Sequence, residues 1–191
     1  MASIEVEIKV QIENAKPLLA LLEKEGKKTG EEHQVDEYFT PAHRDFTAVR
    51  PIIEWLRLRH SDKGDSINYK HFHFDDRGKS LYCDEHESKV SDVKQVELIL
   101  QGLNMVHRIT VDKKRKTYLY KEYEVAFDSV AHLGDFIEIE YKGEAESTDA
   151  QAIKDGMIRF LKELGAGKIS VNHIGYPHQL IAPEDLDVEE L

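Results

Sequence analysis

The chain has 191 residues, of which 40% are hydrophobic and 33% charged, and its formal net charge is -11 at pH 7. This length fits one domain with a substantial core. The acidic balance argues against a general nucleic-acid binder, because neutralising phosphates requires a clustered basic surface.

No stretch approaches the roughly 20 apolar residues of a membrane span, and the start lacks the basic and apolar regions of a signal peptide. The single cysteine, Cys83, excludes an intramolecular disulfide and agrees with a reducing compartment. We therefore expect a cytoplasmic protein with no membrane and no nucleic-acid partner. A homodimer is left open.

Residues 4–10 alternate apolar and charged side chains without a break, which predicts a strand with one apolar face and one charged face. The spacing Glu-x-Glu-x-Lys on its charged face recurs twice. The three copies are Glu5, Glu7, Lys9; Glu85, Glu87, Lys89; and Glu138, Glu140, Lys142. About 0.2 such matches are expected by chance at these Glu and Lys frequencies, so the recurrence needs an explanation.

The remaining elements follow from periodicity and from capping and turn residues. Amphipathic helices are predicted at about 14–26, 92–101 and 149–164, the second capped by Asp92 with Gln95 in capping-box spacing. Further strands are predicted at 30–39, 54–60, 66–75, 81–90, 105–115, 118–128 and 135–142. We expect a single domain over residues 1–181 and a mobile acidic tail over 182–191.

About eight strands joined mostly by short turns predict an α+β fold, in which an antiparallel sheet curls or closes into a barrel with peripheral helices. If the charged faces point inward and the helices cover the apolar faces, the barrel encloses a hydrophilic tunnel. The alternative is an ordinary sandwich whose charged faces are solvated. Periodicity leaves both interpretations open.

Inside such a tunnel, carboxylate pairs would coordinate Mg²⁺ or Mn²⁺, and Arg and Lys side chains would bind phosphate oxygens. The acidic candidates are Glu5, Glu7, Glu122, Glu124, Asp128, Glu138 and Glu140, and the basic candidates are Lys9, Arg57, Arg59, Lys70, Lys113 and Arg115. This mixture of charges predicts a site for a metal polyphosphate complex.

The motifs resemble those of the CYTH superfamily, the triphosphate tunnel metalloenzymes, which include class IV adenylate cyclases and thiamine triphosphatases. The resemblance covers residues 4–165 in the correct order. Its elements are Glu5-x-Glu7-x-Lys9, Leu56-Arg57-x-Arg59, Lys70, Lys113-x-Arg115, the strand ending at Asp128, and Leu133-Gly134-x-Phe136-x-Glu138-x-Glu140. Tyr82, Cys83 and Asp84 stand where relatives often have an Arg, which leaves the roles of Glu85, Glu87 and Lys89 open.

The resemblance implies an eight-stranded antiparallel β-barrel that forms a triphosphate tunnel and binds a divalent metal, Mg²⁺ or Mn²⁺. It implies metal binding by Glu5, Glu7, Asp128, Glu138 and Glu140, and triphosphate binding by Lys9, Arg57, Arg59, Lys70, Lys113 and Arg115. Of these, we expect Lys113, Arg115 and Glu138 to be catalytic.

The leading function is that of a class IV adenylate cyclase, which converts ATP to cyclic AMP and pyrophosphate. The alternative is a triphosphatase acting on thiamine triphosphate, tripolyphosphate or nucleoside triphosphates, and a third possibility is a non-catalytic polyphosphate or nucleotide receptor. The residues that hold a triphosphate are shared by the two enzymes, so the sequence does not choose between them, whereas intact carboxylates at the matching positions count against the receptor.

A second motif, His71-x-His73-x-Asp75, has the spacing of a metal-binding element in metallo-β-lactamase-like hydrolases. That element usually continues with His, whereas Asp76 follows here. We therefore expect these side chains to be the ordinary face of a strand near a turn.

Overall fold

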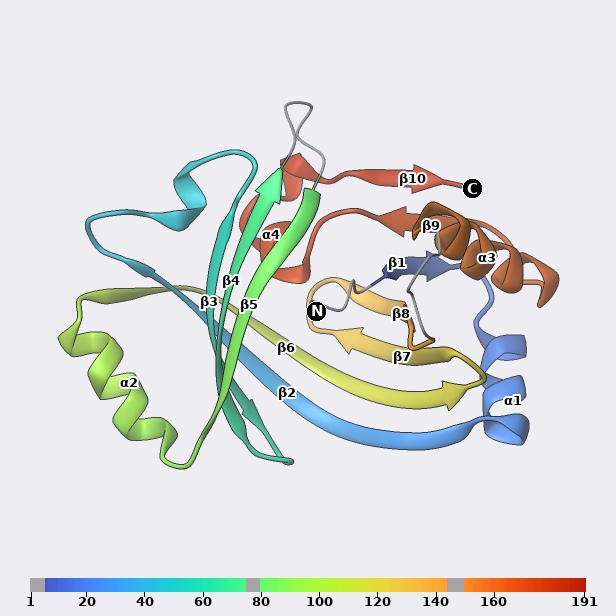
Figure 1. Ribbon diagram of the computed structural model, residues 1–191, viewed down its shortest axis with the longest axis horizontal. Coiled ribbons are helices and arrows are strands. Elements are labelled where there is room, and N and C mark those ends of the chain that lie inside the picture. Colours follow the sequence, from blue (N-terminus) through green and yellow to red (C-terminus); the bar gives the residue numbers. More distant parts are fainter. Residues whose placement is uncertain (1–5, 75–79, 144–149) are drawn as a thin grey trace. The chain divides into compact units, whose positions relative to one another are not determined.

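The computed structural model of the chain describes residues 6–74, 80–143 and 150–191. Ten strands and four α-helices are found in these residues (Figure 1). The strands are β1 (Glu7–Ile12), β2 (Lys27–Pro41), β3 (Glu54–Ser61), β4 (Asp65–Phe74), β5 (Ser80–Val90), β6 (Met105–Tyr120), β7 (Tyr123–Val130), β8 (Gly134–Tyr141), β9 (Ile169–Asn172) and β10 (Val188–Glu190). The helices are α1 (Lys16–Glu25), α2 (Val93–Gly102), α3 (Ala150–Glu163) and α4 (Tyr176–Ile181).

The strands form one antiparallel sheet in the order β10-β9-β1-β8-β7-β6-β2-β3-β4-β5. The predicted α+β class and antiparallel pairing are confirmed. The sheet has ten strands instead of eight, because the short strands β9 and β10 carry too few residues for a periodic signal. Closure into a barrel is not detected, since no pairing joins the edge strands β10 and β5 within the described ranges.

The acidic end of the chain is ordered where the sequence predicted a mobile tail. Strand β10 pairs with β9, and the backbone N–H of Leu191 donates to the carbonyl of Ile169 at 2.8 Å. Lys168 lies 3.0 Å from Glu190, so one of the acidic side chains is also paired. The run of acidic residues predicted a solvated tail. The backbone of β10 is instead hydrogen-bonded to β9, a strand that lies outside this run.

The chain divides into two compact units, and β2 and β6 contribute residues to both. The first unit contains the residues up to 31 together with 113–175 and 182–191, and the second contains 32–112 and 176–181. The single domain predicted over residues 1–181 stays a prediction.

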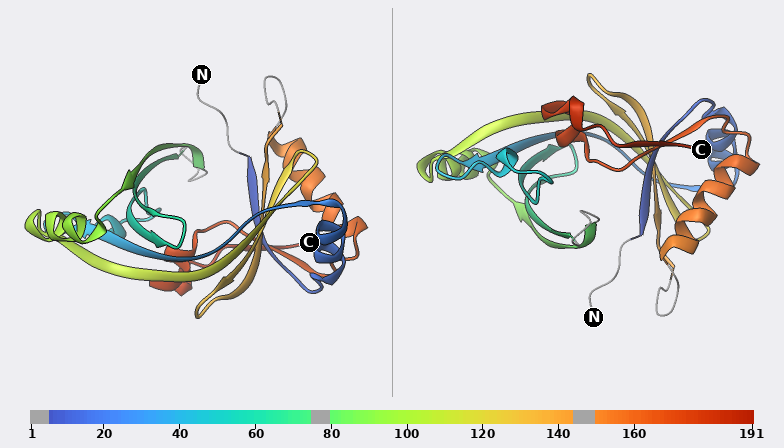
Figure 2. Two further views of the ribbon diagram at one scale, coloured as in Figure 1. Left: turned by 90° about the horizontal axis from the view of Figure 1, so that it is seen from below. Right: turned by 90° about the horizontal axis from the view of Figure 1, so that it is seen from above.

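The core of the first unit lies between the sheet and two helices. Val6, Ile8 and Val10 of the first strand region are buried against Leu22 of α1 and Met157 of α3. Figure 2 shows α1 and α3 on the same side of β1, β7 and β8. The predicted arrangement, in which helices cover the apolar strand faces, is therefore confirmed in this unit.

Local sequence signals explain the helix starts. Pro17 lies in the first turn of α1, where a missing N–H leaves no intrahelical bond unmade. Asp92 caps α2 by accepting a hydrogen bond from the backbone N–H of Gln95 at 3.2 Å, as the capping spacing predicted.

The predicted break between strands at residues 116–117 is wrong, because β6 runs on to Tyr120. The basic run misled the prediction, since in a strand its members alternate between faces: Lys113 is buried while Lys114 is exposed. The turn comes at Lys121, whose φ of 52° places it in the left-handed region.

In the second unit, β3, β4 and β5 form an antiparallel meander (Figure 1). Their register places Arg57 opposite Asn68, which in turn lies opposite Glu87.

None of the helices in residues 6–74, 80–143 and 150–191 combines the length and apolarity needed to cross a membrane.

We predict that Met157→Ala lowers the free energy of unfolding by about 2–5 kcal/mol, because the fully buried side chain leaves a cavity under the sheet. Leu119→Ala, in the same unit at a position 37% exposed, is the control and should cost less than about 1 kcal/mol. Urea unfolding monitored by circular dichroism measures both. Equal losses would contradict the proposed location of the core.

Candidate functional site

Four adjacent strands of the first unit bring predicted site residues together. The register sets Lys9 of β1 directly opposite Glu138 of β8, and Arg115 of β6 directly opposite Asp128 of β7. Opposed residues of neighbouring strands share a face. These side chains therefore lie on the charged face of the sheet, and the apolar alternates in β1 and β8 face the core under α1 and α3.

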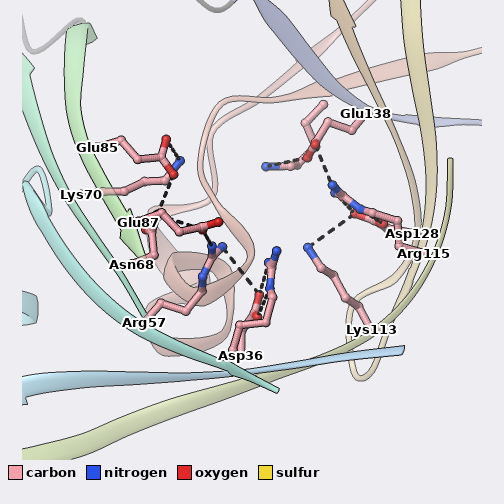
Figure 3. Close-up of polar contacts among 12 residues, drawn as sticks. Asp36, Arg57, Asn68, Lys70, Glu85, Glu87, Lys113, Arg115, Asp128 and Glu138 are labelled. Atoms are coloured by element: carbon pink, nitrogen blue, oxygen red, sulfur yellow. Dashed lines mark hydrogen bonds and ion pairs between the residues drawn. The ribbon is translucent and has the colours of Figure 1, made fainter. Parts of the chain in front are cut away.

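Asp128 is the centre of this cluster (Figure 3). The Nε and Nη2 atoms of Arg115 donate to its two carboxylate oxygens at 2.7 and 2.6 Å. The Nζ atom of Lys113 lies 4.0 Å from the same carboxylate, whose side chain is 0% exposed. A bidentate Arg–carboxylate pair is strong and directional, so Asp128 fixes the orientation of the guanidinium.

Glu138 extends the cluster toward β1. It accepts a hydrogen bond from Nη2 of Arg115 at 3.1 Å, and the Nζ atom of Lys9 lies 3.9 Å from its other oxygen. Burial alone would raise the pKa of the Glu138 carboxyl, but the charges of Arg115, Lys9 and Lys113 outweigh burial and lower that pKa. Glu138 is therefore held in its ionised form.

Three carboxylates lie in a row across the same strands. Glu140 of β8 stands opposite Glu7 of β1 on one side and opposite Glu124 of β7 on the other. Like charges directly opposite one another destabilise a sheet, and a cation bound near them offsets the repulsion. Lys142 lies 2.6 Å from Glu140. Glu5, which the sequence places on the same face, lies outside the described residues.

The second unit contains the same arrangement on β2 and β3. Arg59 donates from Nε and Nη2 to the two oxygens of Asp36 at 2.6 and 2.8 Å, and Nη1 of Arg57 lies 3.9 Å from that carboxylate. The Asp36 side chain is 2% exposed. In both units a buried aspartate accepts two hydrogen bonds from one arginine. The same aspartate lies about 4 Å from a second cation, which stands two residues before that arginine in the chain.

The remaining predicted cations of the second unit are paired by β5. Lys70 lies 3.0 Å from Glu85, and Arg57 donates to Glu87 at 3.0 Å (Figure 3). Asn68 donates to both carboxylates, at 2.7 and 3.3 Å. The second Glu-x-Glu-x-Lys copy therefore contributes the carboxylates that hold Arg57 and Lys70, a role that the sequence left open.

Each unit thus assembles its own share of the predicted residues. The first unit contains Glu7, Lys9, Lys113, Arg115, Asp128, Glu138 and Glu140, and the second contains Arg57, Arg59 and Lys70. Sequence reasoning missed Asp36 and Asn68. A usable signal was present, because an aspartate within a strand is unfavourable unless a cation of a neighbouring strand compensates its charge.

Among the described residues, two groups of potential metal ligands have atoms close enough to share one ion, and both lie in the second unit. They are His71, His73, Asp84 and Glu37, His60, Glu97, and within each group one ligand atom per residue lies within 4.8 Å of the others. Asp75, the third residue of the His71-x-His73-x-Asp75 pattern, lies outside the described residues.

A family model described as the CYTH domain matches residues 3–173. A Methanocaldococcus jannaschii protein named "Putative adenylate cyclase" is 30% identical over 174 residues, which cover 91% of this chain and 96% of the relative.

Solved structures extend the comparison. The PH1819 protein of Pyrococcus horikoshii has a TM-score of 0.72 at 25% identity, covering 94% of this chain and 99% of its own. A Hippeastrum protein described as a "putative adenylyl cyclase" that reveals a dominant triphosphatase activity has a TM-score of 0.65 at 18% identity, covering 95% of this chain and 96% of its own. At this low identity, the similarity to the Hippeastrum protein shows a shared fold alone.

We predict that Asp128→Asn destabilises the first unit by about 3–5 kcal/mol, because Arg115 and Lys113 lose the buried charge that compensates them. The exposed Asp135, also in this unit, provides the matched control: Asp135→Asn should change the free energy of unfolding by less than about 0.5 kcal/mol. Urea unfolding compares the two. An unchanged stability in Asp128→Asn would show that the buried charge is not required.

Proposed function

Because the chain belongs to the CYTH domain family, we propose that it is a metal-dependent enzyme that converts ATP to cyclic AMP and pyrophosphate. The observation that carries the proposal is the charged face of the first unit. There, Lys113 and Arg115 are held by the buried Asp128 beside the row of carboxylates formed by Glu7 and Glu140. Cations suited to phosphate oxygens and carboxylates suited to a metal ion thus occupy one sheet face.

Asp128 prepares the two cations for a polyanion. The cluster contains three cations, Lys9, Lys113 and Arg115, and two carboxylates, Asp128 and Glu138, so one positive charge remains and favours phosphate oxygens. Because Arg115 is already fixed by three hydrogen bonds, it loses little side-chain freedom when a ligand binds. Lys9 belongs to the same proposed phosphate-binding set through its position beside Glu138.

We assign Arg57, Arg59 and Lys70 of the second unit to triphosphate binding as well. The Nε atom of Arg57 is buried and has no hydrogen-bond acceptor in the part of the chain that the structure describes. Buried N–H groups normally have a hydrogen-bond acceptor, and an oxygen atom of a bound ligand would supply the one that is missing here. The proposed role of Asp36 is to hold both arginines in place.

The proposed metal is Mg²⁺ or Mn²⁺, because the donors on this face are carboxylate oxygens, which these hard cations prefer. Glu5, Glu7 and Glu140 would hold it, and Asp128 and Glu138 belong to the same proposed set while also orienting Arg115. When bound, the metal would neutralise charge on the phosphate oxygens.

In the proposed reaction, the 3′-hydroxyl oxygen of ATP forms a bond to the α-phosphorus. The bond from that phosphorus to the bridging oxygen breaks, pyrophosphate leaves, and the hydroxyl proton is released. Lys113 and Arg115 would stabilise the negative charge that develops on the leaving group. Glu138 would keep Arg115 and Lys9 in position for that role.

A second candidate is a triphosphatase, in which water attacks the terminal phosphorus and orthophosphate is released. The dominant triphosphatase activity described for the Hippeastrum protein favours including it. Both reactions use the same phosphate-binding cations. They differ in which phosphorus faces the nucleophile.

We predict that the purified protein with Mg²⁺ or Mn²⁺ releases cyclic AMP and pyrophosphate from ATP in equal amounts. Parallel reactions with thiamine triphosphate and tripolyphosphate, with orthophosphate measured separately, test the second candidate. Orthophosphate without cyclic AMP would exclude the cyclase and support the triphosphatase. Tight triphosphate binding without any product would exclude both enzymes.

We predict that Arg115→Lys lowers kcat about 100-fold, because an ammonium group cannot replace the bidentate contact and the charge placed at the leaving group. Lys114→Ala is the matched control, since Lys114 is the neighbouring exposed cation on the other face of β6. Steady-state kinetics on folded variants compare them. Equal kcat values for the two variants would argue against the charged face as the active site.

A further inference from the structure

Two histidines of β4 and one aspartate of β5 lie together on the face of these strands that the proposed triphosphate site does not use. His71 and His73 are two residues apart, so they share a face, and Asp84 stands directly opposite His71 in the register. Lys70 and Glu85 are the next positions along the two strands and therefore point to the opposite face. The three side chains form a cluster separate from the paired cations.

The side chains already converge. Nε2 of His73 lies 2.7 Å from a carboxylate oxygen of Asp84, and the rings of His71 and His73 are 4.6 Å apart between centroids. One potential ligand atom from each residue lies within 4.8 Å of the other two. Tetrahedral zinc with bonds of about 2.0–2.2 Å places its ligand atoms about 3.3 Å apart, so small side-chain adjustments would reach that geometry.

We propose that His71, His73 and Asp84 form a second metal site, selective for a divalent transition metal such as Zn²⁺. Two imidazoles and one carboxylate make up a donor set that suits zinc and leaves a position open for water. The side chains of His73 and Asp84 are 32% and 53% exposed, so a hydrated ion can reach them. The oxygen-rich donors of the first unit favour the harder Mg²⁺ instead.

Among the described residues, two other potential donors near the cluster are already bonded elsewhere or face away from it. Glu54 lies opposite His71 on β3, but it is buried and accepts hydrogen bonds from the Tyr69 hydroxyl at 2.6 Å and from Arg44. Cys83 is adjacent to Asp84 in β5 and hence points to the other face. Within the part of the chain that the structure describes, the ligand set is therefore His71, His73 and Asp84, which leaves a fourth position for water.

The other His and carboxylate group is a weaker candidate. It has one imidazole, from His60, and two carboxylates, from Glu37 and Glu97, contributed by β2, β3 and α2. His60 lies 2.9 Å from Glu37 and 3.8 Å from Glu97, which is an arrangement that ion pairing explains. A single nitrogen donor gives it less preference for zinc. It serves as an internal control.

Metal binding at His71, His73 and Asp84 would cross-link β4 to β5. The same two strands carry Lys70 and Glu85, whose 3.0 Å ion pair lies on the opposite face. A metal bound to side chains of both strands restrains their backbones, and that restraint would reach the Lys70–Glu85 pair. The inferred role of the site is therefore to stabilise the β4–β5 pair.

Cobalt is the probe, because tetrahedral Co²⁺ replaces Zn²⁺ and absorbs visible light. The full chain, without any affinity tag, is titrated with Co²⁺ in excess Mg²⁺, and we expect one tetrahedral Co²⁺ per chain, displaced by Zn²⁺. His71→Ala, His73→Ala and Asp84→Asn should each weaken Co²⁺ binding at least about tenfold. His60→Ala and Glu7→Gln should leave it unchanged.

Asp84→Asn keeps the shape of the side chain, so weaker binding at an unchanged urea midpoint identifies the loss of a ligand and not the loss of the fold. Absence of a tetrahedral Co²⁺ spectrum in the unmodified chain would overturn the proposal. Unchanged affinity in His71→Ala and His73→Ala, or loss of the site in His60→Ala alone, would overturn it too. None of these outcomes depends on enzymatic turnover.

Discussion

A buried aspartate shared by two cations is the interaction on which the charged faces of both units depend. Removing a carboxylate from water is costly, and the cost is recovered only when cations and hydrogen bonds surround it. Asp128 and Asp36 meet this condition through bidentate pairing with Arg115 and Arg59. In return, each aspartate holds arginine in one orientation, which is what recognition of a phosphate group requires.

The same strands that carry these charges also build the core. In β1, Ile8 and Val10 pack beneath α1 and α3 while Lys9 lies beside Glu138. A shift of one residue in the pairing of β1 with β8 would exchange the two faces, burying the charges in the core. In the first unit, the register that buries the apolar side chains in the core is therefore also the register that brings the charged side chains together.

The chain carries a net charge of -11 and yet presents concentrated cations. The structure reconciles these facts because the cations lie at alternate positions of strands, each beside a carboxylate of a neighbouring strand. Hard oxygen donors gather at Glu7 and Glu140, and imidazoles gather at His71 and His73. Two classes of proposed metal ligand thus occupy separate positions in one chain, and the chemistry of each class favours a different cation.

Period-two alternation, capping residues and turn signals were sufficient to predict the antiparallel α+β class, the amphipathic helices and most strands. These signals are local, since they depend on residues within a few positions of one another. The pairs Lys113-x-Arg115 and Arg57-x-Arg59 were visible for the same reason. The resemblance to the CYTH family then assigned these residues to one expected triphosphate-binding site.

Which residues meet across strands was decided only by the tertiary structure. Asp36 as the partner of Arg59, Asp84 beside His73, and β10 paired with β9 all depend on register between segments far apart in the chain. No local pattern specifies such a register, because it follows from burying one strand face while satisfying the backbone of its neighbours. The candidate residues could therefore be named from the sequence, but their partners could not.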